Sequence, residues 1–495
     1  MIGHFGLGFY SAFIVSKTVE INTLSHQSGA TSAHWICDGG TTYKMGAGTR
    51  EKPGTTITLH LSDDSEDYLE ASKLHSILKK HCSYLPVPIY LKGEHINNKD
   101  PLWLKAPSDC QDEDYLAFYQ ELYPMDPEPM FWIHLNVDYP FHLKGILYFP
   151  KITQRFDHNS SNIKLFCNRV FVSDNCKEIF PDYLTVMRGA LDSPDIPLNV
   201  SRSHLQMDKT VRQLSGHISK KVSDRLANLY QSDREKFLKF WPDIEIVVKL
   251  GILNDEKFYE RSKEFMVWKR LDGGWTTVEE YMERRKEAYQ NKIFYTMAHD
   301  TGSPFLRLYK EKEIEVLLSS HPIDSAVMSR LEQRLSPAKF QRVDGGADDL
   351  LLDKTKEKTL LDAEGKSVSQ KMAECITKFL DNEHVEVEAK SLAHDQIPAF
   401  VVLDEETRRM RDYLSLSDQE IPEHLLGKQK LIVNTNNHLV SAICDLKETN
   451  PALSELLTKH IYDLALLSQK ELKADKLNEF ITRSNEVLTV LAGKI

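Results

Sequence analysis

Residues 2–13 have the sequence IGHFGLGFYSAF, in which three closely spaced glycines precede an apolar helical segment. Gly3, Gly6 and Gly8 follow the order G-x-x-G-x-G, which reverses the dinucleotide-binding fingerprint, and the strand that this fingerprint requires does not precede them. Glycines at this spacing let backbone N–H groups approach phosphate oxygens, and a helix that begins at Phe9 would add its positive end. Taken alone, the motif equally fits a tight turn that packs against a domain core.

Segments typical of β-strands follow this turn. Residues 19–23, 32–36 and 56–61 have strand composition, and in the third segment apolar residues alternate with polar ones, which indicates a half-buried strand. We therefore expect an α+β piece over about 1–66. Because the sequence opens directly in the glycine motif, we expect its start to fall inside a domain, as a truncation or a late start.

The composition is that of an ordinary soluble protein. The length of 495 residues exceeds what one hydrophobic core supports, so we expect two to four domains. The net charge of -11, without a visible basic face, argues against nucleic acid and membrane partners. Seven cysteines without a C-x-x-C pair argue against a zinc site and a disulfide framework. We therefore assign no residue to a metal. With no signal peptide and no long apolar run, we expect a cytoplasmic protein.

Three domains are expected along the chain. A stretch interrupted by prolines precedes residue 110 and indicates a linker, and an acidic, glycine-containing segment at 343–368 indicates a hinge. We therefore divide the chain into residues 1–100, 101–350 and 351–495.

Helical periodicity is clearest in the second and third domains. Val211, Leu214, Ile218 and Val222 would share one face of a long helix. Two terminal amphipathic helices carry apolar stripes, formed by Leu453, Leu456, Leu457, Ile461, Leu464 and Leu467 in one and by Leu477, Phe480, Ile481, Leu488 and Leu491 in the other.

The opening motif resembles, over twelve positions, the glycine-rich lid-hinge motif of the ninety-kilodalton heat-shock chaperones. The resemblance continues in order with WICDGG from Trp35, GTTITLHL from Gly54, PLWLKAPSD around Trp103, NRVFVSD from Asn168 and PLNVSRSHLQ from Pro197. It covers effectively the whole chain. The chain ends without the acidic pentapeptide of eukaryotic cytosolic members, and no long Lys/Glu-rich linker separates the first two domains, which favours the bacterial branch.

The resemblance implies an α+β and α/β multidomain fold. Residues 1–100 would be the C-terminal part of a Bergerat-type nucleotide-binding domain, as in gyrase, histidine kinases and MutL proteins, with a linker. Residues 101–350 would be an α/β middle domain with a catalytic loop and a client face, and 351–495 a mixed dimerisation domain. The implied partners are unfolded or partly folded clients and a second copy of the chain, in a cytoplasmic homodimer.

The resemblance also implies a nucleotide site for ATP with Mg²⁺. Gly3, Gly6 and Gly8 would surround the phosphates, Phe9 would lie beside the nucleotide, and Thr55 would lie in the strand at the floor of the adenine pocket. Without the resemblance, Phe9 and Thr55 would be interpreted as an ordinary core aromatic residue and a strand hydroxyl.

Arg202 and Gln206 would belong to a middle-domain loop that reaches the γ-phosphate. A guanidinium group on such a loop can offset charge that develops on the transferred phosphoryl group, and Gln206 would orient the loop or a water. The alternative for Arg202 is a surface arginine at a helix entrance. The family's general-base Glu, Mg²⁺-binding Asn and adenine-binding Asp lie before the glycine motif and have no counterpart in this sequence. We therefore expect impaired ATP binding and turnover.

The client face would include three apolar residues. Trp103, Ile152 and Phe156 are expected on exposed loops of the middle domain, where the resemblance implies client contact. The alternative is ordinary local packing, because single exposed apolar residues are common.

Two other functions stay open. Gyrase-type ATPases, MutL proteins and sensor kinases share the Bergerat fold, but the charge of -11 and the PLNVSRSHLQ loop fit neither a DNA-facing surface nor a phosphoacceptor domain. The other alternative is a fragment of the same chaperone that holds clients, or only dimerises, without ATP.

Overall fold

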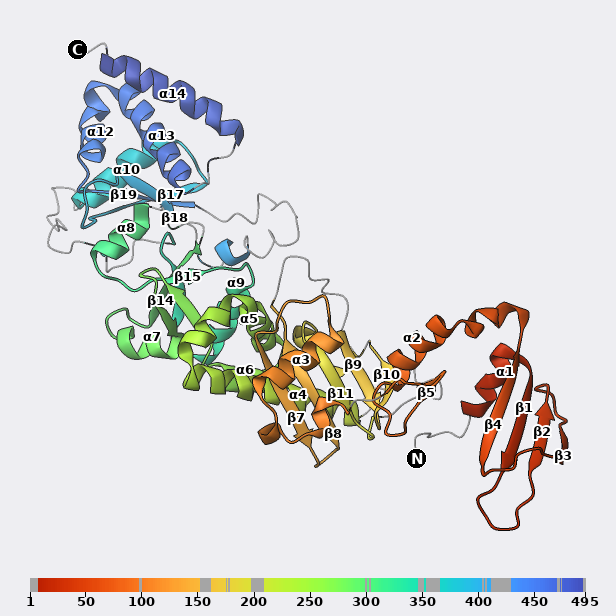
Figure 1. The fold of residues 1–495 in the computed structure, drawn as a ribbon. Coiled ribbons are helices and arrows are strands. Elements are labelled where there is room, and N and C mark those ends of the chain that lie inside the picture. The colour runs from red at the N-terminus through yellow and green to blue at the C-terminus, as the bar shows by residue number, and fades with distance from the viewer. Residues whose placement is uncertain are drawn as a thin grey trace. The chain divides into compact units, whose positions relative to one another are not determined.

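The computed structural model describes the chain in sections, which are residues 8–97, 100–151, 162–174, 176, 179–196, 209–298, 301, 304–345, 351–352, 366–402, 405, 407–410, 429–469, 472 and 474–492. The chain divides into two units, residues 1–229 with 233–243 and residues 230–232 with 244–495. Figure 1 shows the fold as a ribbon coloured along the chain.

The first unit begins with a short helical turn and an antiparallel sheet in the strand order β3-β2-β1-β4. The elements are η1 (Gly8–Ser11), α1 (Ala12–Val15), β1 (Ser16–Leu24), β2 (Ala33–Cys37), β3 (Lys44–Ala47) and β4 (Gly54–Leu61). The three strands predicted from the sequence are therefore confirmed. The alternation in β4 does not produce a buried face, however, because Ile57 and Leu59 remain 52% and 39% exposed.

A second sheet in this unit has the order β10-β9-β11-β8-β7, with a parallel pair between β9 and β11. Its strands are β7 (Phe131–Val137), β8 (Leu143–Phe149), β9 (Asn162–Cys167), β10 (Val170–Ser173) and β11 (Arg188–Asp192). The chain passes from β9 to β10 through a tight hairpin. Asn168 and Arg169 turn the chain with positive φ angles of 51° and 68°, the backbone that a tight two-residue hairpin turn requires.

Helices and a small β-pair complete the first unit. They are α2 (Ala71–Cys82), the pair β5 (Tyr90–Leu91) and β6 (Glu94–His95), α3 (Asp112–Leu122), and the long helices α4 (Lys209–Ser232) and α5 (Arg234–Asn254), within which the division between the units falls. The predicted face of α4 is confirmed, because Val211, Leu214, Ile218 and Val222 are fully buried.

The second unit contains two further sheets with helices around them. The first, in the order β13-β12-β15-β14-β16, comprises β12 (Val267–Arg270), β13 (Trp275–Thr277), β14 (Lys292–Met297), β15 (Leu317–Ser319) and β16 (Lys339–Arg342), with α6 (Glu256–Ser262), α7 (Val278–Arg285), α8 (Pro304–Glu311) and α9 (Asp324–Arg334). The second, β17-β19-β18, comprises β17 (Val385–Lys390), β18 (Ala399–Val402) and β19 (Gln429–Asn434), with α10 (Val368–Leu380), α12 (His438–Thr449), α13 (Pro451–Ser468) and α14 (Ala474–Ala492).

The predicted multidomain fold of helices and mixed sheets is thus confirmed. The Bergerat-type assignment and the domain boundaries near residues 100 and 350 stay predictions. Among the helices that the structure describes, none is both long and apolar enough to span a bilayer.

Candidate functional site

Aromatic residues gather where the chain enters the N-terminal sheet. Phe9 in η1 contacts Trp35 of β2 and Phe13 of α1 edge to face, with ring centroids 5.9 Å and 6.0 Å apart. In Figure 1, α1 lies against this sheet. The side chain of Phe9 nevertheless remains 37% exposed. Phe9 therefore belongs to a cluster but is not a closed core residue, so its ring can still take a ligand.

The strand register places Thr55 on the same face of the sheet as Trp35, which Phe9 contacts. Trp35 pairs with Ile21 of β1, and Ile21 pairs with Ile57 of β4, so these three side chains share one face. Thr55 lies two positions before Ile57 in β4 and therefore points to that face too. The structure thus brings Phe9 and Thr55 to one face, while their contact with a nucleotide stays a prediction.

Polar groups on this face are accessible. The hydroxyl oxygens of Thr55 and Thr23 are 2.8 Å apart and share a hydrogen bond in which either can donate. Each hydroxyl has further hydrogen-bonding capacity for a ligand. At Gly8, apart from its chain neighbours and its own helical turn, no atom of the described residues lies within 4 Å of the place where a Cβ would stand. Gly3 and Gly6 lie outside the described residues.

Four other predicted site residues also lie outside the described sections. They are Arg202 and Gln206 of the predicted catalytic loop and Ile152 and Phe156 of the predicted client face. Their roles stay predictions.

The prediction that Trp103 is exposed is wrong. Its side chain is 1% exposed and packs against Tyr84 and Phe166, each with ring centroids 5.1 Å away. The indole Nε1–H donates a hydrogen bond to Asp192 Oδ2 at 3.3 Å. Burial raises the pKa of the Asp192 carboxyl group, against the hydrogen bonds that lower it. The neighbouring Leu104 carries the exposed apolar side chain instead.

Metal binding has no visible basis in the described sections. No three His, Cys, Asp or Glu side chains of those residues are grouped so that they could hold a metal ion.

The C-terminal helix α14 presents an apolar stripe. The ring of Phe480 stacks on His460 of α13 at 5.3 Å, and Arg483 forms an ion pair with Asp463 of α13. These contacts fix the rotation of α14 about its axis. The stripe is formed by Leu477, Ile481, Leu488 and Leu491, which are 42%, 48%, 61% and 57% exposed.

The predicted stripes are therefore divided differently in the structure. Phe480 faces α13 and not the exposed stripe of α14. In α13, Ile461 is fully buried in the core, whereas Leu464 and Leu467 are exposed. The small residues Ser454, Thr458 and Ala465 of α13 are buried as well.

One polar cluster was missed in the sequence analysis. Arg270, Arg284 and Arg285 surround the carboxylate of Glu315 in the second unit. The paired arginines at the end of α7 were a signal, since basic residues suit a helix C-terminus, but nothing in the sequence named their acceptor.

Known proteins match this chain over most of its length. The family described as "Hsp90 protein" matches residues 92–493. A "Chaperone protein htpG" of Bacteroides fragilis is 39% identical over 93% of this chain and 71% of the relative. A "Chaperone protein HtpG" of Bacteroides thetaiotaomicron is 37% identical over the same shares. One of Serratia proteamaculans is 31% identical over 99% of this chain and 81% of the relative. The resemblance found in the sequence is confirmed by these matches, and the chain belongs to the Hsp90 family of heat-shock chaperones.

Proposed function

We propose that this chaperone works as a homodimer, joined through its C-terminal helices, that binds unfolded or partly folded proteins under the control of ATP. The chaperone function itself follows from family membership. The dimer, the ATP contacts and the client face are the parts proposed here.

The proposed dimer rests on the exposed apolar stripe of α14. Leu477, Ile481, Leu488 and Leu491 lie on one helical face and are between 42% and 61% exposed. Burying a side chain of this size contributes about 1.5 to 3 kcal/mol. In a two-fold dimer each side chain is covered in both copies, so the stripe supplies a self-complementary interface. Leu464 and Leu467 of α13 add to the exposed apolar surface of the same domain.

The double substitution Leu488→Glu and Leu491→Glu tests the dimer. Light scattering of the full chain should give twice the chain mass for the unchanged protein and one chain mass for the double variant. Thr489→Glu is the matched control, because Thr489 is exposed on the same helix but lies off the stripe. Far-ultraviolet circular dichroism must show the same helix content in all three. A double variant that stays dimeric, or an unchanged protein that is monomeric, would contradict the proposal.

The proposed ATP contact rests on the sheet face that bears Phe9 and Thr55. Its half-exposed aromatic ring suits a base, and its hydroxyl pair suits the polar groups of a nucleotide. We therefore assign ATP contact to this face. Arg202 and Gln206 are proposed to reach the γ-phosphate from the middle domain, and Ile152 and Phe156 to contact clients.

ATP-independent holding is the second candidate function. Met45, Ile57 and Leu59 are exposed large apolar residues on the Phe9 face of the N-terminal sheet. Exposed apolar patches bind unfolded chains without a nucleotide. Suppression of the aggregation of a heat-unfolded reporter enzyme, measured with and without ATP, separates the two functions. ATP-dependent suppression supports the main proposal, and equal suppression supports passive holding.

A further inference from the structure

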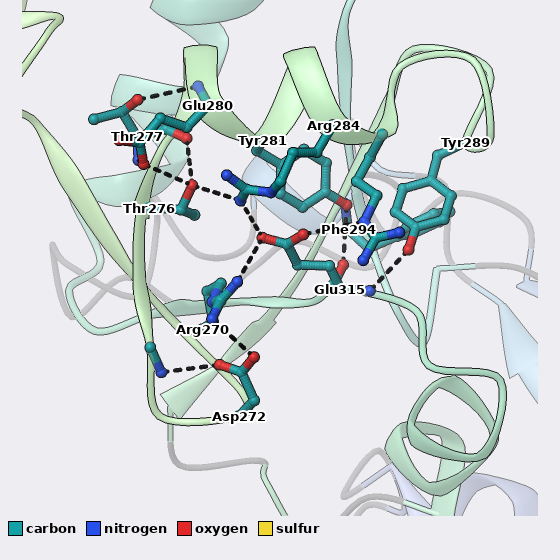
Figure 2. A network of polar contacts seen from close by, with 12 residues as sticks. Arg270, Asp272, Thr276, Thr277, Glu280, Tyr281, Arg284, Tyr289, Phe294 and Glu315 are labelled. Carbon is teal, nitrogen blue, oxygen red and sulfur yellow. Dashed lines mark hydrogen bonds and ion pairs between the residues drawn. The ribbon is translucent and has the colours of Figure 1, made fainter.

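A nearly buried carboxylate in the second unit is surrounded by three guanidinium groups, which Figure 2 shows from close by. The side chain of Glu315 is 5% exposed, and its Oε1 lies 2.7 Å from Arg284 Nη2 and 3.5 Å from Arg270 Nη1. Its Oε2 lies 3.2 Å from Arg285 Nε. Asp272 adds a second carboxylate, 3.0 Å from Arg270 Nη2. Three positive charges therefore meet two negative charges in this cluster.

Hydrogen bonds to the backbone of Glu315 hold the cluster in place. The hydroxyl group of Tyr281 donates to the carbonyl oxygen of Glu315 at 2.9 Å, and the Glu315 N–H donates to the hydroxyl oxygen of Tyr289 at 3.0 Å. Tyr281 and the two arginines Arg284 and Arg285 belong to α7, which begins with a capping box at Thr277. Two of the three guanidinium groups thus come from a helix, and the third, that of Arg270, comes from β12.

A cavity of about 530 Å³ opens beside this cluster. This volume lies within the range of small-molecule sites, about 300 to 1,000 Å³. Its lining residues include the basic Arg270, Arg285 and Lys310 and the apolar Leu271, Ile314 and Val316. The cavity therefore offers both basic and apolar residues to an amphiphilic ligand.

Arg285 retains donors that a ligand can use. A guanidinium group has five N–H bonds, and within the described sections only the Nε of Arg285 has an acceptor, which is Glu315. Its side chain is 41% exposed, and its guanidinium carbon lies 5.7 Å from the centre of the Tyr289 ring. Lys310, at the end of α8, makes no ion pair with any residue in those sections, and its side chain lines the same cavity. Two terminal nitrogens and one ammonium group are thus available.

We propose that this cavity binds a carboxylate that is attached to an apolar group. The two terminal nitrogens of Arg285 pair with the two carboxylate oxygens, a geometry for which the guanidinium fork is suited. Lys310 adds a second positive charge, and the apolar part lies against Leu271 and Ile314.

The acidic residues that line the cavity determine which ligand charge is favoured. Asp272 is paired with Arg270, and Glu315 is shared among three arginines, so neither attracts a cation. Glu313 also lines the cavity and repels multiply charged anions. A singly charged carboxylate is therefore favoured over a phosphate group. Such a carboxylate can come from a free organic acid or from the C-terminus of a peptide.

The test uses nuclear magnetic resonance of the full chain labelled at its isoleucine methyl groups. Ile314 is a suitable reporter because it lines the cavity. The probes are octanoate, a short peptide that ends in leucine with a free carboxylate, the same peptide as an amide, and inorganic phosphate. We expect octanoate, the acid peptide or both to shift the Ile314 methyl signal with a measurable Kd, and the amide and phosphate to bind at least about tenfold more weakly. The acid that binds more tightly identifies the source.

Two variants and a control connect this binding to the named side chains. Arg285→Gln should weaken carboxylate binding about tenfold or more, and it leaves Arg284 and Arg270 on Glu315. Lys310→Gln should also weaken it and removes no ion pair of the described residues. Arg307→Gln, one turn earlier on α8 and paired with Glu311, should leave it unchanged. Equal binding of acid and amide, full affinity in both cavity variants, or no shift with either acid would overturn the proposal.

Discussion

Lys249 of α5 and Asp324 at the start of α9 form an ion pair in which Nζ and Oδ1 are 2.5 Å apart and both side chains are fully buried. Glu245, one turn earlier on α5, pairs with the same ammonium group, which lies 4.4 Å from the centre of the Trp268 ring. His321 closes the network, with its Nε2 3.6 Å from a Glu245 oxygen. Because buried charges are costly unless they are paired, each charge in this link between α5 and α9 depends on its partners.

The first prediction concerns the removal of the central cation. Lys249→Met should lower the free energy of unfolding by about 3 to 5 kcal/mol, because it leaves the Asp324 carboxylate buried without its partner. Urea unfolding followed by tryptophan fluorescence measures the change, and Trp268 is a reporter beside the substituted position.

A control variant and a double variant distinguish the effect of the lost charge from the effect of the changed side chain. Lys239→Met places the same side chain on the same helix at an exposed position and should have little effect. Adding Asp324→Asn to Lys249→Met should recover part of the loss. Its amide oxygen can still accept the hydrogen bonds that Asp324 takes from residues 319–321. A loss no greater than that of Lys239→Met would contradict the buried-pair interpretation.

The His321–Glu245 contact predicts a pH dependence. The contact with the Glu245 carboxylate raises the pKa of His321 above its ordinary value of 6.5. Burial acts to raise the pKa of Glu245, but hydrogen bonds to His321 and Lys249 and the nearby charges outweigh it, so the pKa falls below 4.5. The contribution of His321 to stability is therefore complete below pH 6.5 and is lost as pH rises through its folded-state pKa. That of Glu245 is complete above pH 4.5 and is lost as pH falls through its folded-state pKa.

Substitution of His321 tests this window. The loss of thermal stability in His321→Gln should be larger at about pH 5.5 than at about pH 8.5, because the unchanged protein has already lost the protonated contact at the higher pH. His438→Gln, at an exposed position on α12, should show no such difference. An equal loss for His321→Gln at both pH values would count against the contact.

Local patterns predicted the elements of the fold well where their cause is local. The buried face of α4 follows from the helical spacing of Val211, Leu214, Ile218 and Val222, and β1, β2 and β4 follow from strand composition. The hairpin at Asn168 and Arg169 was missed because neither residue is glycine, although both adopt positive φ angles. Asparagine readily adopts this conformation, whereas arginine rarely does, so the pairing of β9 with β10 holds Arg169 in it.

The sites show the limit of sequence patterns more clearly. Lys249 and Asp324, or Arg285 and Glu315, meet only because separate elements pack together, and no local spacing reports such a meeting. Trp103 was expected on an exposed loop, where the resemblance implied client contact, yet a short helical turn at Leu102–Leu104 directs its ring inward. The composition of an irregular segment does not indicate which of its side chains are buried.

The burial of Trp103 leads to a further prediction. Trp103→Ala should lower the free energy of unfolding by about 3 to 5 kcal/mol, because it empties a space among Tyr84, Phe118 and Phe166. Leu104→Ala, at the exposed neighbour, should cost far less. Chemical unfolding of both variants measures the difference. If Trp103→Ala altered client binding while stability stayed unchanged, the ring would have to be exposed in solution.

The last prediction concerns the nucleotide face. Thr55→Val should weaken the binding of a fluorescent ATP analogue by about threefold to tenfold, since it removes one hydrogen-bonding group and keeps the shape of the side chain. Thr58→Val is the matched control, because Thr58 lies three positions further along β4 and points to the opposite face. Phe9→Ala should also weaken binding by removing the exposed ring. If Thr55→Val and Thr58→Val changed affinity equally, the effect would come from β4 as a whole. If the unchanged protein failed to bind the analogue, the ATP part of the proposed function would be wrong, while the dimer and the carboxylate cavity would keep their own tests.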